Sequence, residues 1–327
     1  MRSWRWSVAV VLGAVCGALF VMGFSTICIA ISKEYAILWP WHFPGVYLTR
    51  PTYSFEFFPP KTEAAEASFW EAIPALAALA PSFMTVTYGA GGSTRDKTLE
   101  IVAKLRAQTK LPVAAHLTFI NTTRDDVFKV TDALWENGTR HIIALRGDLP
   151  ADLTWPLAID KNYFQYTSDF IEALCKRHQF EISVAAYPEK HPDSKSLDDD
   201  IFALKKKCDA GATRAITQFF FENDKFYSFV EKCQKAGITT PISPGLLPVH
   251  DFKSMLRFAG RCQASVPGWL AEGFAKFEGQ PDDSRKYAEE LLVKQVLDLA
   301  KNGVPHIHFY TLNKPDITTQ ACKALQQ

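Results

Sequence analysis

A carboxyl group and an arginine–glycine–aspartate triplet interrupt apolar runs of this sequence in a way that could do chemistry. Glu56 lies among phenylalanines in "SFEFFPPK", and Arg146, Gly147 and Asp148 end the apolar run of "RHIIALRGDLP". Desolvation in an aromatic pocket favours the neutral carboxyl form, so Glu56 is a candidate general acid near neutral pH. Asp148, beside a cation, would more readily remain ionised. The two carboxyl groups therefore predict proton delivery at one site and charge stabilisation at the other.

Both features also have purely structural explanations. Neighbouring residues of a strand point to opposite sides, so Glu56 in an outward orientation would form an ordinary surface salt bridge. The triplet from Arg146 to Asp148, taken alone, is equally typical of a surface turn. The sequence around these residues leaves both alternatives open.

Polar residues occupy the ends of other apolar runs as well, where a buried core would not select them. They are Thr87, Tyr88, His116, Thr118, Tyr187, Glu189, His191, Gln218, Tyr310, Thr311 and Asn313. His116 by itself is more typical of a hydrogen-bonded core histidine than of a functional one. Polar groups at the ends of at least six runs nevertheless favour a single functional rim.

The positions of these polar residues follow from a regular alternation of predicted strands and helices. Eight short apolar runs cover residues 53–58, 83–88, 112–118, 141–147, 181–187, 214–220, 241–246 and 306–312. Mostly continuous apolar strands, each separated from the next by a helical pattern, are typical of a parallel sheet covered on both faces. Eight such units predict a closed (β/α)8 barrel, in which chemistry occurs at the carboxyl ends of the strands.

Helix boundaries can also be predicted along the chain. Ser93 or Thr94 is a candidate N-cap, and the Asn137-Gly138 pair and Gly211 are candidate C-terminal ends of helices. The long interval between the seventh and eighth strands, residues 247–305, must hold extra helices. The patterns "DFKSMLRFAGRCQ" and "SRKYAEELLVKQVLDLAKNG" supply them.

The first fifty residues differ from the rest of the chain. Residues 7–32 carry no charge and are long enough to cross a bilayer, which takes roughly 20 apolar residues. Three interpretations stay open: a signal anchor with Arg2 and Arg5 on the cytoplasmic side, a secretory signal, or an extended reading of the start codon. The predicted organisation is therefore an N-terminal segment over residues 1–50 and a barrel domain over residues 51–327.

The overall composition excludes several function classes. The chain has 327 residues and a net charge of +1, which gives no electrostatic case for a nucleic-acid partner. Seven scattered cysteines predict neither a disulfide framework nor a zinc knuckle, and indicate a reducing compartment such as the cytoplasm. No HExxH motif, clustered ligand set or GxSxG motif occurs, so we expect no metal centre and no serine hydrolase.

Seven segments in order resemble the methylenetetrahydrofolate reductase family, in its short bacterial form, from about Tyr53 to the carboxyl end. The segments are "SFEFFPPK", "VTYGAGGSTRDKT", "HLT", "HIIALRGDLP", "SVAAYPEKHP", "RAITQFFF" and "HFYTLNK". The resemblance implies a barrel with non-covalent FAD, which NADH or NADPH reduces before leaving. In the ping-pong cycle that the resemblance implies, folate then takes the same flavin face. The implied product, 5-methyltetrahydrofolate, would feed methionine synthesis.

The resemblance also implies roles for individual residues. Glu56 matches the general acid that protonates a folate nitrogen, and Asp148 matches the acid near flavin and pterin. Gln218 matches a folate-binding amide, and Phe258 an aromatic residue that packs on nicotinamide or folate. The implied flavin contacts are Thr87, His116, Arg146, Gly147, Asp148, Tyr166, Tyr187, His191, Lys206 and Lys207.

Some positions depart from the family pattern. Lys206 replaces an arginine and Ala203 stands where some relatives carry an asparagine, which affects the adenine and phosphate part of the implied site. The short form lacks a regulatory domain after the barrel, and relatives commonly form homo-oligomers. Two rival functions remain: another flavin- or pterin-binding barrel with a different electron donor, and a membrane-tethered binding protein without turnover.

Overall fold

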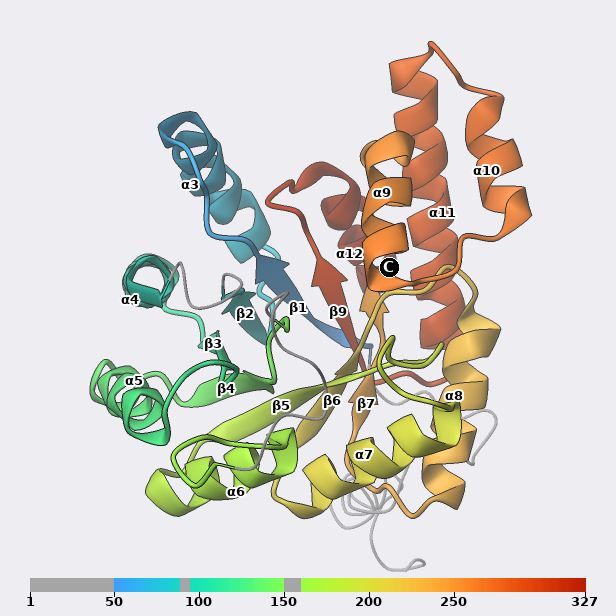
Figure 1. Ribbon diagram of the computed structural model, residues 1–327. Helices are drawn as coiled ribbons and strands as arrows, with labels where there is room; N and C mark the ends of the chain where they lie inside the picture. Colours follow the sequence, from blue (N-terminus) through green and yellow to red (C-terminus); the bar gives the residue numbers. More distant parts are fainter. Residues whose placement is uncertain (1–49, 89–94, 150–159) are drawn as a thin grey trace, which may run out of the picture. The chain divides into compact units, whose positions relative to one another are not determined.

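Parallel strands form one nine-stranded sheet that curls into a barrel in the computed structural model, which describes residues 50–88, 95–149 and 160–327 (Figure 1). The order around the sheet is β7-β6-β5-β4-β3-β2-β1-β9-β8. The strands are β1 (Thr52–Phe57), β2 (Phe83–Val86), β3 (Val113–Thr118), β4 (His141–Leu145), β5 (Glu181–Ala186), β6 (Arg214–Thr217), β7 (Ile242–Ser243), β8 (Gly245–Leu246) and β9 (His306–Tyr310). The predicted (β/α)8 barrel is confirmed.

The seventh predicted strand, over residues 241–246, is divided in two by Pro244. β7 pairs with β6, whereas β8 pairs with β9 on the other side. Proline has no N–H to donate to a ladder, so it ends the first pairing. Its carbonyl still accepts the N–H of His308 at 2.9 Å. This short, interrupted segment is where the two ends of the sheet meet.

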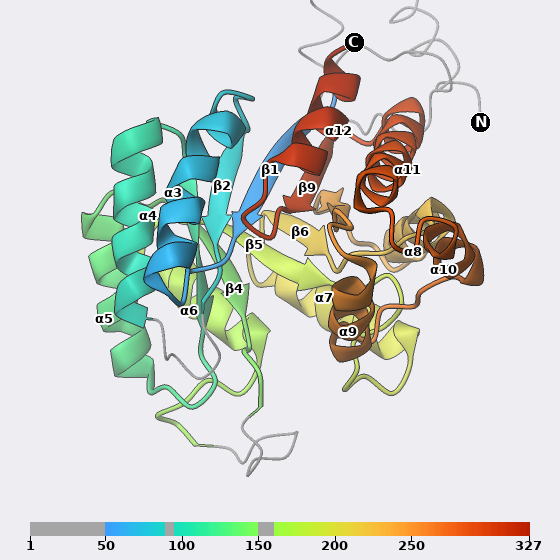
Figure 2. The same cartoon turned by 90° about the horizontal axis from the view of Figure 1, so that it is seen from above.

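Helices cover the outside of the barrel between the strands (Figure 2). They are α3 (Glu63–Ala77), α4 (Arg95–Thr109), α5 (Arg124–Glu136), α6 (Thr167–Arg177), α7 (Leu197–Asp209), α8 (Asn223–Lys235), α9 (Phe252–Cys262), α10 (Gly268–Ala275), α11 (Pro281–Lys301) and α12 (Asp316–Gln326). Short polar side chains begin several of them: Thr62, Thr123, Ser196 and Asp251 each accept an N–H from the first turn.

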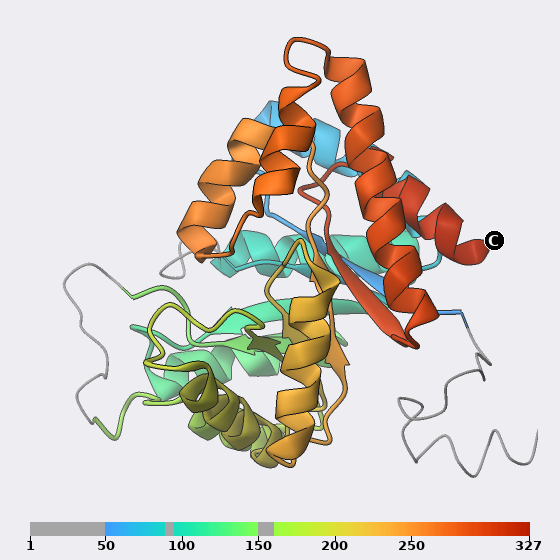
Figure 3. The same ribbon diagram turned by 90° about the vertical axis from the view of Figure 1, so that its right-hand side faces the viewer.

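Three helices lie together between β8 and β9 (Figure 3). Two of them, α9 and α11, confirm the predicted extra helices. The short α10 was not predicted, because "GWLAEGFA" contains two glycines and has little polar face to define a helical period. The predicted C-terminal end of α5 is confirmed by its cap, Asn137, followed by Gly138 with a φ of 78°.

The interior of the barrel contains polar side chains as well as the usual apolar ones. Phe83, Ala114, Ile143 and Ile216 form an apolar layer of the kind expected there. Next to it, β1 and β9 carry polar side chains at every second position, all of them buried apart from Thr52 and Tyr310. They are Thr52, Ser54 and Glu56 on β1 and His306, His308 and Tyr310 on β9.

Two of the predictions fall wholly or largely on residues that the structure does not describe. The N-cap predicted at Ser93 or Thr94 and the hypotheses about residues 7–32 lie outside the described residues. Within residues 50–88, 95–149 and 160–327, no helix is long and apolar enough to cross a membrane.

Candidate functional site

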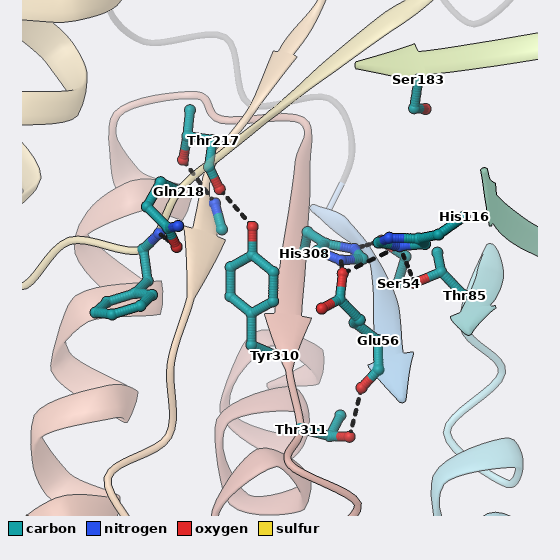
Figure 4. A network of polar contacts seen from close by, with 12 residues as sticks. Ser54, Glu56, Thr85, His116, Ser183, Thr217, Gln218, His308, Tyr310 and Thr311 are labelled. Atoms are coloured by element: carbon teal, nitrogen blue, oxygen red, sulfur yellow. Dashed lines mark hydrogen bonds and ion pairs between the residues drawn. The ribbon is translucent and has the colours of Figure 1, made fainter. Parts of the chain in front are cut away.

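Glu56 points into the barrel rather than into an aromatic pocket. Only 7% of the residue is exposed, and its Oε2 lies 3.3 Å from Nε2 of His116 and 3.5 Å from Nε2 of His308 (Figure 4). The phenylalanines on either side of Glu56 belong to the opposite face of β1. Phe57, for example, meets Phe69 of α3 at 5.7 Å between ring centroids. The alternation of strand side chains separates the acid from its sequence neighbours.

The electrostatics of Glu56 differ from the sequence-based expectation in the same way. Burial opposes ionisation, but the charge and hydrogen bond of His116 and the hydrogen bond of His308 lower the pKa of Glu56 from 4.5 to about 2. Burial lowers the pKa of His308, so we take this imidazole to be neutral and to act on Glu56 by donating a hydrogen bond. The prediction of a carboxyl group held neutral by aromatic desolvation was therefore wrong.

The neighbouring ends of β9 and β6 fix the rim around this acid. The hydroxyl of Thr311 donates to the backbone carbonyl of Glu56 at 2.7 Å, and that of Tyr310 donates to the carbonyl of Thr217 at 2.7 Å (Figure 4). A side chain at Gly245 would meet the carbonyl of Thr217 at 2.1 Å and the ring of Tyr310. The close approach of these strands therefore depends on that glycine.

Three further predicted site residues lie at or near this rim. Thr87 follows β2 and donates its N–H to the carbonyl of Phe57 at 2.9 Å. Gln218 follows β6, and its Oε1 accepts the N–H of Phe219 at 3.0 Å. Phe258 on α9 stacks on Phe219, with centroids 5.4 Å apart and planes 15° from parallel. Phe219 thus connects the predicted amide and aromatic contacts.

A cavity of about 540 Å³ opens at the carboxyl ends of β4 and β5 and over the start of α6 and the end of α7. This volume lies within the roughly 300 to 1,000 Å³ typical of small-molecule and cofactor sites. Eight of the ten predicted flavin contacts line it: Arg146, Gly147, Asp148, Tyr166, Tyr187, His191, Lys206 and Lys207. Of the other two, Thr87 directly follows β2 and His116 lies on β3, on the side of Glu56.

The cavity contains half-buried basic groups. Arg146 pairs with Asp193 at 2.7 Å, and the ammonium group of Lys207 donates to the carbonyl of Ala185 at 2.5 Å. Burial lowers the pKa of Lys207 and, with the nearby Arg146 cation, that of His191. An anion that entered the cavity would stabilise the protonated forms of these groups, which burial disfavours.

Gly147 has a local reason to be glycine. Its φ is 95°, and a Cβ there would lie 2.5 Å from Cγ2 of Ile120. This conformation turns the chain out of β4, so that Asp148 is exposed at the cavity wall. The residues that end the apolar run, 146–148, therefore form a sharp turn and also line the cavity.

Several residues at the site were not predicted. Asp193 and Asp200 line the cavity, and Asp200 accepts the backbone N–H of His191 at 2.9 Å, yet nothing in their sequence context distinguishes them. Ser54 and His308 did carry a signal, because each stands two residues from a predicted rim residue on the same strand. The described part of the chain has no group of three metal-ligating side chains placed to hold an ion.

The chain is similar to known proteins in sequence and in fold. Residues 47–326 match the family described as "Methylenetetrahydrofolate reductase". The "5,10-methylenetetrahydrofolate reductase" of Escherichia coli (strain K12) is 41% identical over 272 residues, which cover 83% of this chain and 90% of that protein. The "Methylenetetrahydrofolate reductase (NADH) 1" of Zea mays is 33% identical over 275 residues, or 81% of this chain and 46% of that protein.

A solved structure shares the fold at low sequence identity. It is titled "Uncharacterized protein from Clostridium thermocellum binds two copies of 5-methyl-5,6,7,8-tetrahydrofolic acid". The TM-score is 0.58 at 16% identity, over 85% of this chain and 95% of that chain. The likeness supports the barrel architecture.

Proposed function

Because this chain belongs to the methylenetetrahydrofolate reductase family, we propose that it reduces 5,10-methylenetetrahydrofolate to 5-methyltetrahydrofolate with FAD and NADH or NADPH. Family membership makes the protein an oxidoreductase of one-carbon metabolism. One observation supports the detailed proposal most directly. A buried carboxylate held by two imidazoles lies at the same end of the barrel as a cavity whose charged lining includes Arg146, Lys206 and Lys207.

The cavity has the volume of a cofactor site, and its lining combines three cations with four aspartates, of which Asp193 pairs with Arg146. Lys206 and Lys207 come from the last turn of α7, and Arg146 comes from the end of β4. Three cations around one cavity suit a diphosphate, whose charge would offset the burial of Lys207. Lys206 supplies the charge at the position where relatives carry an arginine. FAD, when bound, supplies the hydride-transfer chemistry.

Glu56 would control the proton of the folate half-reaction. In the free protein its carboxylate is ionised and accepts hydrogen bonds from His116 and His308 at 3.3 and 3.5 Å. A folate that excludes water from this cluster would raise the proton affinity of the carboxylate. Glu56 would then take up a proton from solvent as the folate binds and pass it to a folate nitrogen, which opens the ring that holds the methylene carbon.

Three further residues would orient the two alternating substrates. Gln218 accepts the backbone N–H of Phe219, Phe258 stacks on the ring of Phe219, and Asp148 is exposed at the cavity wall. An amide, an aromatic face and an acid suit a pterin, which presents hydrogen-bonding edges and flat faces. A single rim also suits a ping-pong cycle, in which nicotinamide and folate occupy one position in turn.

A spectroscopic experiment on the full-length protein tests this function. The purified protein should be yellow, NADH or NADPH should bleach it without oxygen, and methylenetetrahydrofolate should restore the colour. Failure to bleach with either nucleotide would contradict the electron donor. Bleaching without reoxidation by the folate would contradict the substrate. Size-exclusion chromatography and cell fractionation address the predicted homo-oligomer and cytoplasmic location, which stay predictions.

A further inference from the structure

A continuous hydrogen-bonded chain connects Glu56 with the opposite end of the barrel. His308 lies 3.5 Å from Glu56 through Nε2 and 2.7 Å from the hydroxyl of Ser54 through Nδ1. Ser54 lies 2.9 Å from Nε2 of His306, whose Nδ1 lies 2.7 Å from the hydroxyl of Thr52. Thr52 is exposed, while Ser54 and His308 are completely buried.

The pairing of β1 with β9 creates this chain. The register places Thr52 opposite His306 and Ser54 opposite His308, so the side chains alternate between the two strands. Because residues of one strand that lie two apart share a face, all five side chains point into the barrel. No sequence-local interaction could assemble them, since β1 and β9 are separated by about 250 residues.

The donor and acceptor roles of these groups fix the direction of every hydrogen bond from Thr52 to Glu56. The ionised carboxylate of Glu56 accepts hydrogen bonds only, so His308 must donate to it through Nε2. Burial lowers the pKa of both His308 and His306, so both rings are neutral and each has one donor and one acceptor. Nδ1 of His308 therefore accepts from Ser54, whose oxygen accepts from His306. The last acceptor, Nδ1 of His306, takes the hydroxyl of Thr52.

We propose that Ser54 is a positioning residue for the folate half-reaction, which acts through His308 to orient the carboxylate of Glu56 and set its proton affinity. This inference rests on the proposed role of Glu56. A hydroxyl that donates to Nδ1 holds the ring in the tautomer with the proton on Nε2 and strengthens that N–H as a donor. His306 and Thr52 complete the chain by fixing the hydroxyl proton of Ser54.

The described part of the barrel contains a second buried serine–histidine pair, which is not hydrogen-bonded to the chain that leads to Glu56. Ser183 on β5 is also completely buried, and its hydroxyl lies 2.8 Å from Nε2 of His141. Among the described residues, the structure gives this pair no hydrogen bond to Glu56. Ser54→Ala and Ser183→Ala therefore remove the same group from the same kind of environment, and only the first removes a contact with the chain.

Other ionisable groups that face Glu56 and His308 are unchanged in both variants. They are His116 on β3, Tyr310 on β9, Arg214 on β6, and the rings of His141 and His306. A difference between the two variants can therefore be assigned to the Ser54 hydroxyl rather than to a changed charge nearby.

The first measurement does not depend on turnover. The full-length protein, labelled with ¹⁵N in its eight histidines, would give ring-nitrogen NMR signals that report the tautomer and the hydrogen bonds of each ring. Spectra of His308→Asn and His306→Asn assign the two rings. We expect wild-type His308 to be protonated on Nε2 and hydrogen-bonded at Nδ1. Ser54→Ala should move its signals, while Ser183→Ala should move only those of His141.

The second measurement is the pH profile of flavin reoxidation by methylenetetrahydrofolate. Ser54→Ala should shift the profile upward by roughly one pH unit, the size expected when a hydrogen bond to a charged group is weakened. Flavin reduction by NAD(P)H should stay within about twofold of wild type. Ser54→Thr, which keeps the hydroxyl, should restore the profile, and Ser183→Ala should leave it in place.

Two results would overturn the inference. One is a wild-type His308 protonated on Nδ1, because the chain would then run the other way. The other is a pH profile that Ser54→Ala leaves unchanged or that Ser183→Ala shifts equally. If Ser54→Ala does not fold, His306→Phe, which removes the donor to Ser54, replaces it, with a shift expected in the same direction. Failure of the proposed function is distinguishable, because wild type itself would then not be reoxidised.

Discussion

At the scale of single residues, the chemistry depends on which side of a strand each side chain occupies. Glu56 and its phenylalanine neighbours are adjacent in sequence, but the acid faces the barrel interior and the rings face the helices. Two imidazoles therefore determine its charge, and the carboxylate is ionised in the free protein. Any acid role must use a proton delivered to this cluster when the substrate binds.

Substitution of Glu56 should separate the two proposed half-reactions. We expect Glu56→Gln to leave flavin reduction by NAD(P)H nearly intact, because that step needs no proton from Glu56. Reduction of the folate should fall by about 100-fold or more, in the range of a lost general acid. Stopped-flow measurements of each half-reaction, with Glu66→Gln on α3 as a control, check this. Comparable losses in both steps would contradict the assigned role.

Substitution of Gly147 tests the turn at the end of β4. Gly147→Ala should destabilise the fold by about 1–3 kcal/mol, because a φ of 95° is strained for alanine and its Cβ meets Ile120. Gly260→Ala on α9 is the control, since a Cβ there meets nothing within 4 Å. We expect the control to be neutral or slightly stabilising in urea unfolding. Equal effects of the two changes would exclude backbone strain as the cause.

At the scale of elements, the inserted helices and the paired strands β1 and β9 position different parts of the site. The strand pair builds the hydrogen-bonded chain below Glu56, and α9 brings Phe258 to the rim. The interrupted strand at Pro244 lets the sheet close while leaving its carbonyl to bond with His308. Positioning therefore comes from contacts between elements that are far apart in sequence.

Truncation of Phe258 tests the contribution of α9 to substrate binding. Phe258→Ala removes a ring stacked on Phe219, and we expect the KM for the folate to rise by about 10-fold, as for loss of about 1.4 kcal/mol of stacking. Leu256→Ala on the same helix, where the side chain is 41% exposed, should leave KM unchanged. Steady-state kinetics with varied folate distinguish the two. A similar rise in both variants would indicate a general disturbance of α9.

At the scale of the whole molecule, the polar barrel interior makes stability depend on pH. Burial lowers the pKa of His141 to about 3 and of His306 to about 2, from 6.5 in the unfolded chain. Between these values the unfolded chain binds more protons, so stability is lost as the pH falls below 6.5. Glu56, lowered from 4.5 to about 2, adds a loss of the same sign below pH 4.5.

The free energy of unfolding should therefore decrease between pH 6.5 and pH 5. Each buried neutral histidine contributes a slope of up to about 1.4 kcal/mol per pH unit. His141→Gln should reduce the slope by about that amount, since one titrating group is removed. Urea unfolding at pH 7, 6 and 5 measures it. A slope that the variant leaves unchanged would show that His141 is not buried in its neutral form.

The sequence by itself determined the architecture and the general place of the site. Alternating apolar strands and capped helices predict the barrel, because local periodicity records which face of each element is buried. The rim residues could be predicted, since parallel strands bring their carboxyl ends to one edge. The extents of the strands over 83–88 and 214–220 were overestimated, because the rim residues continue the apolar pattern after the ladder has ended.

Only the tertiary structure decided how the site is built. It placed His116 and His308 against Glu56, gathered the cavity cations around Asp193 and Asp200, and joined Ser54 to His306. The sequence could not reveal these contacts, because they depend on the register between strands up to about 250 residues apart. A shift of one residue in that register would turn every side chain to the other face. The charge of Glu56 is therefore a property of the closed barrel, not of "SFEFFPPK" alone.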